Sequence, residues 1–159
     1  MEKELKTIML VLSTTRQSPK SVEYAVETAI ENNSHIELLF IVDSKIPDLV
    51  FEKMNEMNLL PEGQSEELYE TILREYRQRG YSLIEDIEAV LREKEIAYSV
   101  FIERGDFAEE ALRKIRALLP DLVILTRSRR SKISKFLYGS SVDFLVRESP
   151  CQIRIVEEL

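Results

Sequence analysis

The 159-residue sequence contains one cysteine, one histidine and no long apolar run. The single cysteine, Cys151, excludes an internal disulfide framework and is typical of a reducing cytoplasm. The single histidine, His35, has no cysteine or second histidine near it in the sequence, which favours a structural role over metal binding. No apolar stretch reaches the roughly 20 residues of a membrane-spanning helix, and the charged amino terminus lacks the hydrophobic core of a signal peptide. We therefore expect a cytoplasmic protein that does not contact membranes.

Acidic residues outnumber basic ones, and the formal net charge is -7. This balance argues against a protein that coats nucleic acid, although local clusters of charge can act independently of it. The sharpest such cluster is the segment 127–135, which carries five basic side chains and no acidic one. Three interpretations stay open for it: a solvated surface loop, a phosphate site built from arginine side chains, or a surface for nucleic acid or an acidic partner.

Short apolar runs alternate with amphipathic stretches along the whole chain, which predicts a single α/β domain over residues 1–159. Ser18 and Pro19 are typical of a helix start, and Gly80 either bends the helical stretch 65–95 or lies within a helix that overhangs the domain. The segment at about 43–64 contains two prolines and is predicted to be an irregular insertion or flap. The predicted strands are 7–12, 35–42, 98–103, 121–125 and 152–156.

This alternation of strands and helices implies right-handed crossovers and a parallel sheet with helices on both faces. In such open sheets the ligand crevice lies at the carboxyl ends of the strands, beside the point where the strand order reverses. The strands 7–12 and 121–125 are expected to flank it.

A glycine–serine pair, Gly139 and Ser140, stands where the last helix is expected to begin, and Ser141 follows it. Free backbone N–H groups and a hydroxyl at a helix start can cap the helix or bind an anion such as phosphate. The two roles use the same groups and can coexist.

Several short stretches, taken in their order along the chain, carry a resemblance to a known family. They are Tyr24-Ala25, Ile41-Val42-Asp43, Gly105-Asp106 with Ala108-Glu109-Glu110, Asp121-Leu122-Val123-Ile124, and Gly139-Ser140. Together they are similar to the universal stress proteins over essentially the whole chain. The resemblance implies an adenine-nucleotide alpha-hydrolase-like fold, in which an open five-stranded parallel sheet has the order 3-2-1-4-5 and helices on both faces.

The nucleotide motif of that family is Gly, two residues, Gly, nine residues, Gly, then Ser or Thr. With Gly139-Ser140 at its end, the two earlier glycines fall on Thr126 and Arg129, whose Cβ atoms restrict positive φ and close phosphate approach. The family's Asp after the first strand falls on Ser13, and Val42 matches a residue that packs near the base. The candidate nucleotide-binding residues are Ser13, Val42, Thr126, Arg127, Arg129, Gly139, Ser140 and Ser141.

The resemblance also implies a homodimer in which the last strand pairs across a two-fold axis, through the interface candidates Gln152, Ile153, Arg154, Ile155 and Val156. We interpret the chain as a stress-response regulatory or interaction domain with a degenerate nucleotide site and an unknown protein partner, rather than as an enzyme. One alternative is a switch or weak ATPase that binds ATP or AMP, with Mg²⁺, through the basic loop. The other is a protein whose basic loop binds an acidic partner or nucleic acid.

Overall fold

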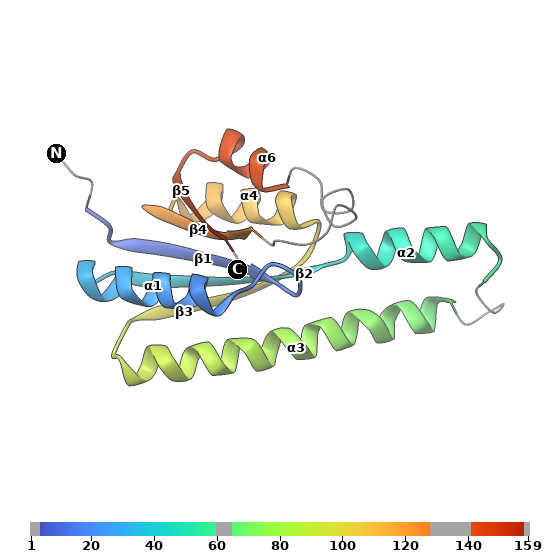
Figure 1. Cartoon of the computed structure of the whole chain (residues 1–159), viewed down its shortest axis with the longest axis horizontal. Coiled ribbons are helices and arrows are strands. Elements are labelled where there is room, and N and C mark those ends of the chain that lie inside the picture. Colours follow the sequence, from blue (N-terminus) through green and yellow to red (C-terminus); the bar gives the residue numbers. More distant parts are fainter. Residues whose placement is uncertain (1–3, 60–64, 128–140, 158–159) are drawn as a thin grey trace.

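A computed structural model describes residues 4–59, 65–127 and 141–157, and its centre is a five-stranded parallel sheet in the order β3-β2-β1-β4-β5 (Figure 1). This confirms the predicted fold class and strand order. The strands are β1 (Thr7–Ser13), β2 (His35–Asp43), β3 (Tyr98–Gly105), β4 (Leu122–Arg127) and β5 (Gln152–Glu157). The helices are α1 (Pro19–Asn32), α2 (Lys45–Glu56), α3 (Ser65–Glu93), α4 (Phe107–Leu118) and α6 (Ser141–Glu148).

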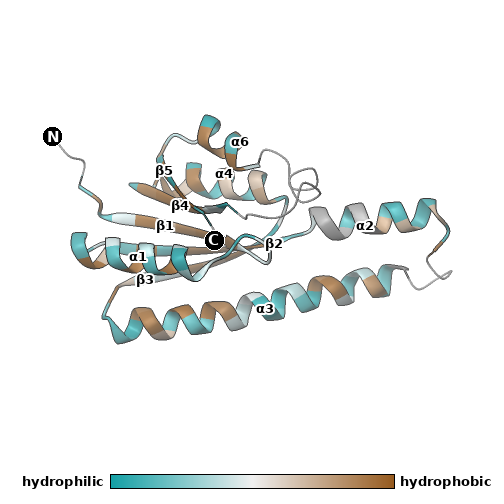
Figure 2. Cartoon of the chain, viewed as in Figure 1, coloured by the Kyte–Doolittle hydropathy of each residue, from teal (hydrophilic) through white to brown (hydrophobic). Residues whose placement is uncertain are grey.

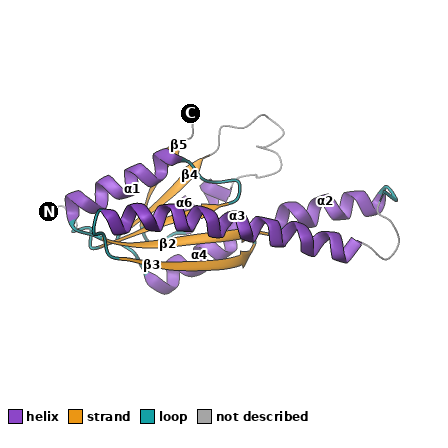
Figure 3. Cartoon of the chain, turned by 90° about the horizontal axis from the view of Figure 1, so that it is seen from below, coloured by secondary structure: helices purple, strands orange, loops and turns teal. Residues whose placement is uncertain are grey.

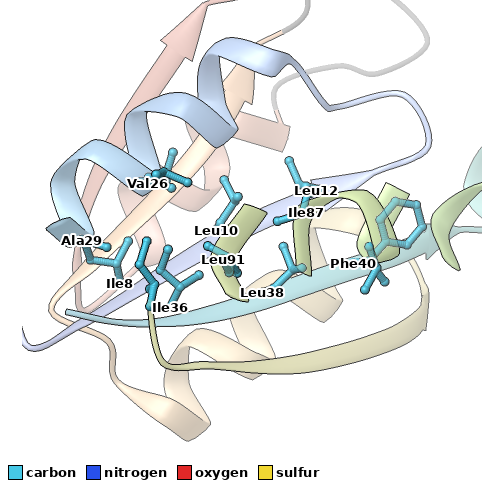
Figure 4. Close-up of a cluster of buried hydrophobic side chains, with 14 of the residues drawn as sticks. Ile8, Leu10, Leu12, Val26, Ala29, Ile36, Leu38, Phe40, Ile87 and Leu91 are labelled. Carbon is cyan, nitrogen blue, oxygen red and sulfur yellow. The ribbon is translucent and has the colours of Figure 1, made fainter. Parts of the chain in front are cut away.

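Helices cover both faces of the sheet, so alternate strand residues enter two separate cores. On β1, Ile8, Leu10 and Leu12 pack in a cluster with residues of α1 and α3, which Figure 4 shows from within. Met9 and Val11 pack on the opposite face with α4 and α6. Burial on both sides explains why the strands read as nearly continuous apolar runs. Figure 2 shows the same contrast between hydrophobic strands and helices of mixed hydropathy.

The first helix begins as its sequence predicts. The Oγ of Ser18 accepts a hydrogen bond from the backbone N–H of Lys20 at 3.2 Å, and Pro19 is the first helical residue. The helix ends where Asn33 adopts φ 53°, a left-handed conformation that asparagine tolerates better than most residues. Together these signals place α1 directly after the turn that follows β1.

The long helix α3 runs through Gly80 as one 29-residue element, so the glycine does not mark a break. Figure 3 shows α3 crossing β2 and β3 and continuing beyond the sheet beside α2. A Cβ atom added at Gly80 would lie only 2.8 Å from Cδ1 of Phe40, a buried ring of β2. Gly80 is therefore required for the close approach of α3 to the sheet.

The segment at about 43–64 differs from the irregular flap that the sequence predicts, because its first half forms the twelve-residue helix α2. Pro47 falls in the first turn, where a backbone N–H has no partner within the helix, so the proline costs no hydrogen bond there. The ring of Phe51 packs edge-on against that of Tyr69 on α3, with centroids 5.3 Å apart. The Tyr69 hydroxyl also donates a hydrogen bond to Asp48. Residues 60–64 lie outside the described part of the chain.

The buried carboxyl of Glu37 on β2 gives a first testable prediction. Burial raises its pKa, the negative charge of Asp121 raises the pKa further, and its Oε2 has no hydrogen-bond partner. A carboxyl whose folded-state pKa is raised favours the folded protein at low pH and loses that contribution as pH rises through the folded-state pKa. Glu37→Gln is therefore expected to raise the free energy of unfolding by about 1 kcal/mol at neutral pH, with a smaller gain in acid.

Urea denaturation at two pH values would measure this, with Glu85→Gln on the exposed surface of α3 as the matched control. An equal effect of Glu37→Gln at both pH values, or a loss of stability at neutral pH, would contradict the explanation.

Candidate functional site

The candidate crevice lies at the carboxyl ends of β1 and β4, the central strands beside which the strand order reverses. Ser13, the last residue of β1, is fully buried there. Its backbone N–H donates to the carbonyl of Arg16 at 3.1 Å, and its Oγ accepts from the backbone N–H of Arg16 at 3.0 Å. Both polar groups of Ser13 are thus used to close a tight turn.

That turn places Arg16 in the protein interior, where its side chain is only 6% exposed. Its guanidinium carbon lies 4.5 Å from the centroid of the Phe107 ring, which is buried at the start of α4. A desolvated guanidinium above an aromatic face is attracted to it by about 2 kcal/mol. Arg16 is not among the residues predicted from the sequence, because nothing local in the sequence indicates a contact with the distant Phe107.

Thr126, where the family motif has its first glycine, is buried against α1 at the end of β4. Its Oγ1 lies 2.5 Å from the Oγ of Ser21 in the first turns of α1. This hydrogen bond ties β4 to α1, so the hydroxyl serves the packing of the two elements.

Arg127, the last residue of β4, is held by two carboxylates. Its guanidinium lies 3.4 Å from Oδ1 of Asp143 on α6 and 3.8 Å from Oε1 of Glu157 on β5. Ser141 is the first residue of α6. The other candidates of the basic loop and helix start, Arg129, Gly139 and Ser140, lie outside the described residues.

Polar groups of two further kinds border the crevice. The hydroxyl oxygens of Thr14 and Thr15, which follow Ser13, are buried and have no hydrogen-bond partner in the structure. Asp43 is buried at the end of β2, and Asp106 caps α4 by accepting from the backbone N–H of Glu109 at 3.1 Å.

Val42 is buried at the end of β2 and lines a small cavity on the α3 face of the sheet, together with Leu73 and charged residues of α3 and β3. Its side chain lies on the same sheet face as Phe40, in the core that contains α1 and α3. The structure thus brings Ser13 and Thr126 to the ends of neighbouring strands and places the side chain of Val42 against α3.

The dimer candidates all lie on β5, an edge strand that among the described residues pairs only with β4. Ile153 packs into the core on the α4 side and Val156 into the core on the α1 side. Arg154 on this strand lies over the ring of Tyr24, with its guanidinium carbon 5.3 Å from the centroid. The strand therefore presents partly exposed apolar side chains and one unpaired backbone edge.

Across the described ranges, no group of three or more histidine, cysteine or acidic residues could hold a metal ion. His35 instead hydrogen-bonds through Nε2 to the Oγ of Ser99, at 2.9 Å. Within the same ranges, none of the helices combines the length and the apolar character needed to span a membrane.

Comparison with known proteins agrees with this architecture. The family model described as "Universal stress protein family" matches residues 4–157, and the chain therefore belongs to the universal stress protein family. A universal stress protein of Methanothermobacter thermautotrophicus is 23% identical over 138 residues, which cover 85% of this chain and 84% of that protein.

Two solved structures illustrate the shared fold. Universal stress protein UspA from Lactobacillus plantarum superposes with a TM-score of 0.73 at 11% identity, covering 98% of this chain and 99% of that one. A universal stress protein family protein from Arabidopsis thaliana, solved with AMP bound, gives a TM-score of 0.57 at 16% identity and covers 97% and 92% of the two chains. At these identities the likeness concerns the fold alone.

Proposed function

We propose that this universal stress protein is a non-enzymatic regulatory or interaction domain that works in the cytoplasm as a homodimer, without a nucleotide in its crevice. The observation that carries the proposal is the position of Arg16, whose buried guanidinium covers Phe107 beside the strand ends. Ser13 and Thr126 add to it, because their hydroxyls already bond within the protein. A ligand that stacked on Phe107 would have to displace the guanidinium of Arg16 first.

Replacing Arg16 by alanine tests this blocking role. Removal of the guanidinium uncovers one face of the Phe107 ring, so Arg16→Ala is expected to bind adenosine or AMP at least about tenfold more tightly than the parent. Calorimetric titration of both proteins measures the difference. The matched control is Arg147→Ala, since Arg147 lies over Phe144 on the exposed surface of α6. Equal affinity of the parent and Arg16→Ala, with both proteins folded, would contradict the blocking role.

A second candidate function is an ATP- or AMP-binding switch, or a weak ATPase, in which Mg²⁺ accompanies the nucleotide. The buried hydroxyls of Thr14 and Thr15 favour it, since a bound ligand would satisfy them. A relative from Arabidopsis thaliana was solved with AMP bound. If ATP stabilised the parent but not the variant Gly139→Ala/Ser140→Ala, this switch would replace our proposal.

A third candidate is binding of an acidic partner or nucleic acid by the segment 127–135. Its first residue, Arg127, already forms ion pairs with Asp143 and Glu157 within the chain. Binding of this kind weakens steeply as salt rises. Filter binding that stayed unchanged between low and moderate salt would count against it.

The homodimer is proposed through β5. An exposed strand edge invites pairing with another chain, and pairing across a two-fold axis would satisfy the free backbone groups of both copies. The partly buried apolar residues Ile153 and Ile155 would extend the contact.

A further inference from the structure

A small cavity lies where α3 passes the carboxyl ends of β2 and β3. Its volume is about 200 Å³, and it is lined by Val42, Glu70, Leu73, Arg74, Arg77 and Arg104. Arg104 stands opposite Val42 in the pairing of β3 with β2, so the two side chains share the sheet face that α3 covers. Glu70, Arg74 and Arg77 follow one another at spacings of four and three on α3 and so share one side of that helix.

The charges around this cavity are not balanced. Three arginines and one acidic residue, Glu70, line the cavity, and Arg74 and Arg77 are exposed to solvent. The carboxylate of Glu70 lies 3.7 Å from the guanidinium of Arg104. Neither Arg74 nor Arg77 makes an ion pair with any described residue. Two arginines three positions apart on a helix repel each other, so the site carries uncompensated positive charge in a chain whose net charge is -7.

The other two arginines of α3 show that this arrangement is particular to the cavity. Arg79 pairs with Glu75 at 2.9 Å and Arg92 pairs with Glu88 at 3.7 Å, each with the acid four residues earlier. The residue four positions before Arg77 is Leu73. The residue four positions before Arg74 is Glu70, which pairs with Arg104 on β3 instead.

We propose that the cavity binds a phosphate or diphosphate group through Arg74, Arg77 and Arg104. Guanidinium groups bind phosphate oxygens in pairs through charge-assisted hydrogen bonds, and a ring of three provides enough donors for a multivalent oxyanion. A volume of about 200 Å³ is smaller than the roughly 300–1,000 Å³ of pockets that bury whole drug-sized ligands. The site thus fits the anionic group rather than a nucleoside. It lies on the α3 face, so it does not depend on whether the crevice beside Ser13 binds a nucleotide.

Calorimetric titration with pyrophosphate, without Mg²⁺ and at moderate ionic strength, tests the proposal. The parent is expected to bind one pyrophosphate per chain, and Arg74→Gln/Arg77→Gln is expected to bind at least about tenfold more weakly. The matched control is Arg79→Gln/Arg92→Gln, which removes the same charge from the same helix and is expected to change the affinity by less than about twofold. Glu70→Gln removes the competing carboxylate and is expected to tighten binding.

Three results would overturn the proposal. One is absence of pyrophosphate binding by the folded parent. The second is equal weakening in the two double variants, which would indicate a general charge effect. The third is unchanged affinity in Glu70→Gln, which would place the anion elsewhere even if Arg74→Gln/Arg77→Gln failed to fold. An Arg16→Ala variant that bound pyrophosphate like the parent would keep this site separate from the crevice.

Discussion

Gly80→Ala is expected to destabilise the protein by about 2 kcal/mol, although alanine in place of glycine within a helix ordinarily adds up to about 1 kcal/mol of stability. The added methyl group would overlap the ring of Phe40, which is buried in the core between β2 and α3, so either the ring or the helix must shift. For a chain of this length the melting temperature is expected to fall by about 5 °C. Thermal unfolding followed by circular dichroism measures the change.

Two further variants distinguish the steric overlap with Phe40 from the helix propensity of alanine. Ser82→Ala, on the exposed side of the same helix, is expected to be neutral or slightly stabilising. In a Phe40→Leu background, which leaves space opposite Gly80, the cost of Gly80→Ala is expected to shrink by at least about 1 kcal/mol. If the Gly80→Ala variant were more stable than the parent, α3 would not need its close contact with Phe40.

Ile155→Lys is expected to convert the proposed homodimer into a monomer. In a two-fold pairing of β5 with its own copy, the central residues of both strands lie near the axis, and Ile155 is one of them. The substitution therefore brings two like charges together in an apolar contact. The dissociation constant of the dimer is expected to rise by at least about 100-fold. Light scattering coupled to gel filtration would report twice the chain mass of 18.5 kDa for the parent and 18.5 kDa for the variant.

The control for this experiment is Ile30→Lys, because Ile30 is 54% exposed on α1 and lies outside β5. The control is expected to remain a dimer. A parent that ran as a monomer, or an Ile155→Lys variant with the mass of the parent, would exclude the β5 dimer. Thermal unfolding of the variant verifies that it is folded, since Ile155 is partly buried within one chain.

The sheet could be predicted from the sequence because its signals are local. The three central strands are short apolar runs, and Ser18 with Pro19 marks the start of α1. The family resemblance then supplied the strand order, which the observed sheet confirms. The helix α2 was missed because Pro47 was taken as a sign of irregular structure, whereas a proline in the first turn of a helix is tolerated.

The interior of the crevice could not be predicted, because its contacts join distant parts of the chain. Arg16 meets Phe107, and Ser21 meets Thr126, through hydrogen-bonding and packing that depend on how the elements assemble. The sequence predicted that Thr126 restricts a phosphate loop, but it could not place the threonine hydroxyl against α1. Likewise Gly80 was interpreted as a bend or an overhang, while its close contact with Phe40 became visible only in the assembled fold.

The chain keeps the family's fold, and in our proposal its own side chains fill the nucleotide crevice. The most direct test is the melting temperature of the parent protein with and without millimolar ATP or AMP and Mg²⁺, with pyrophosphate at equal concentration as the control. A ligand present at about 100 times its Kd stabilises the folded state by about 2.7 kcal/mol, which would raise the melting temperature by roughly 5–10 °C. We predict that neither nucleotide raises it beyond the effect of pyrophosphate. A clear further increase with ATP or AMP would contradict the claim and establish the nucleotide switch.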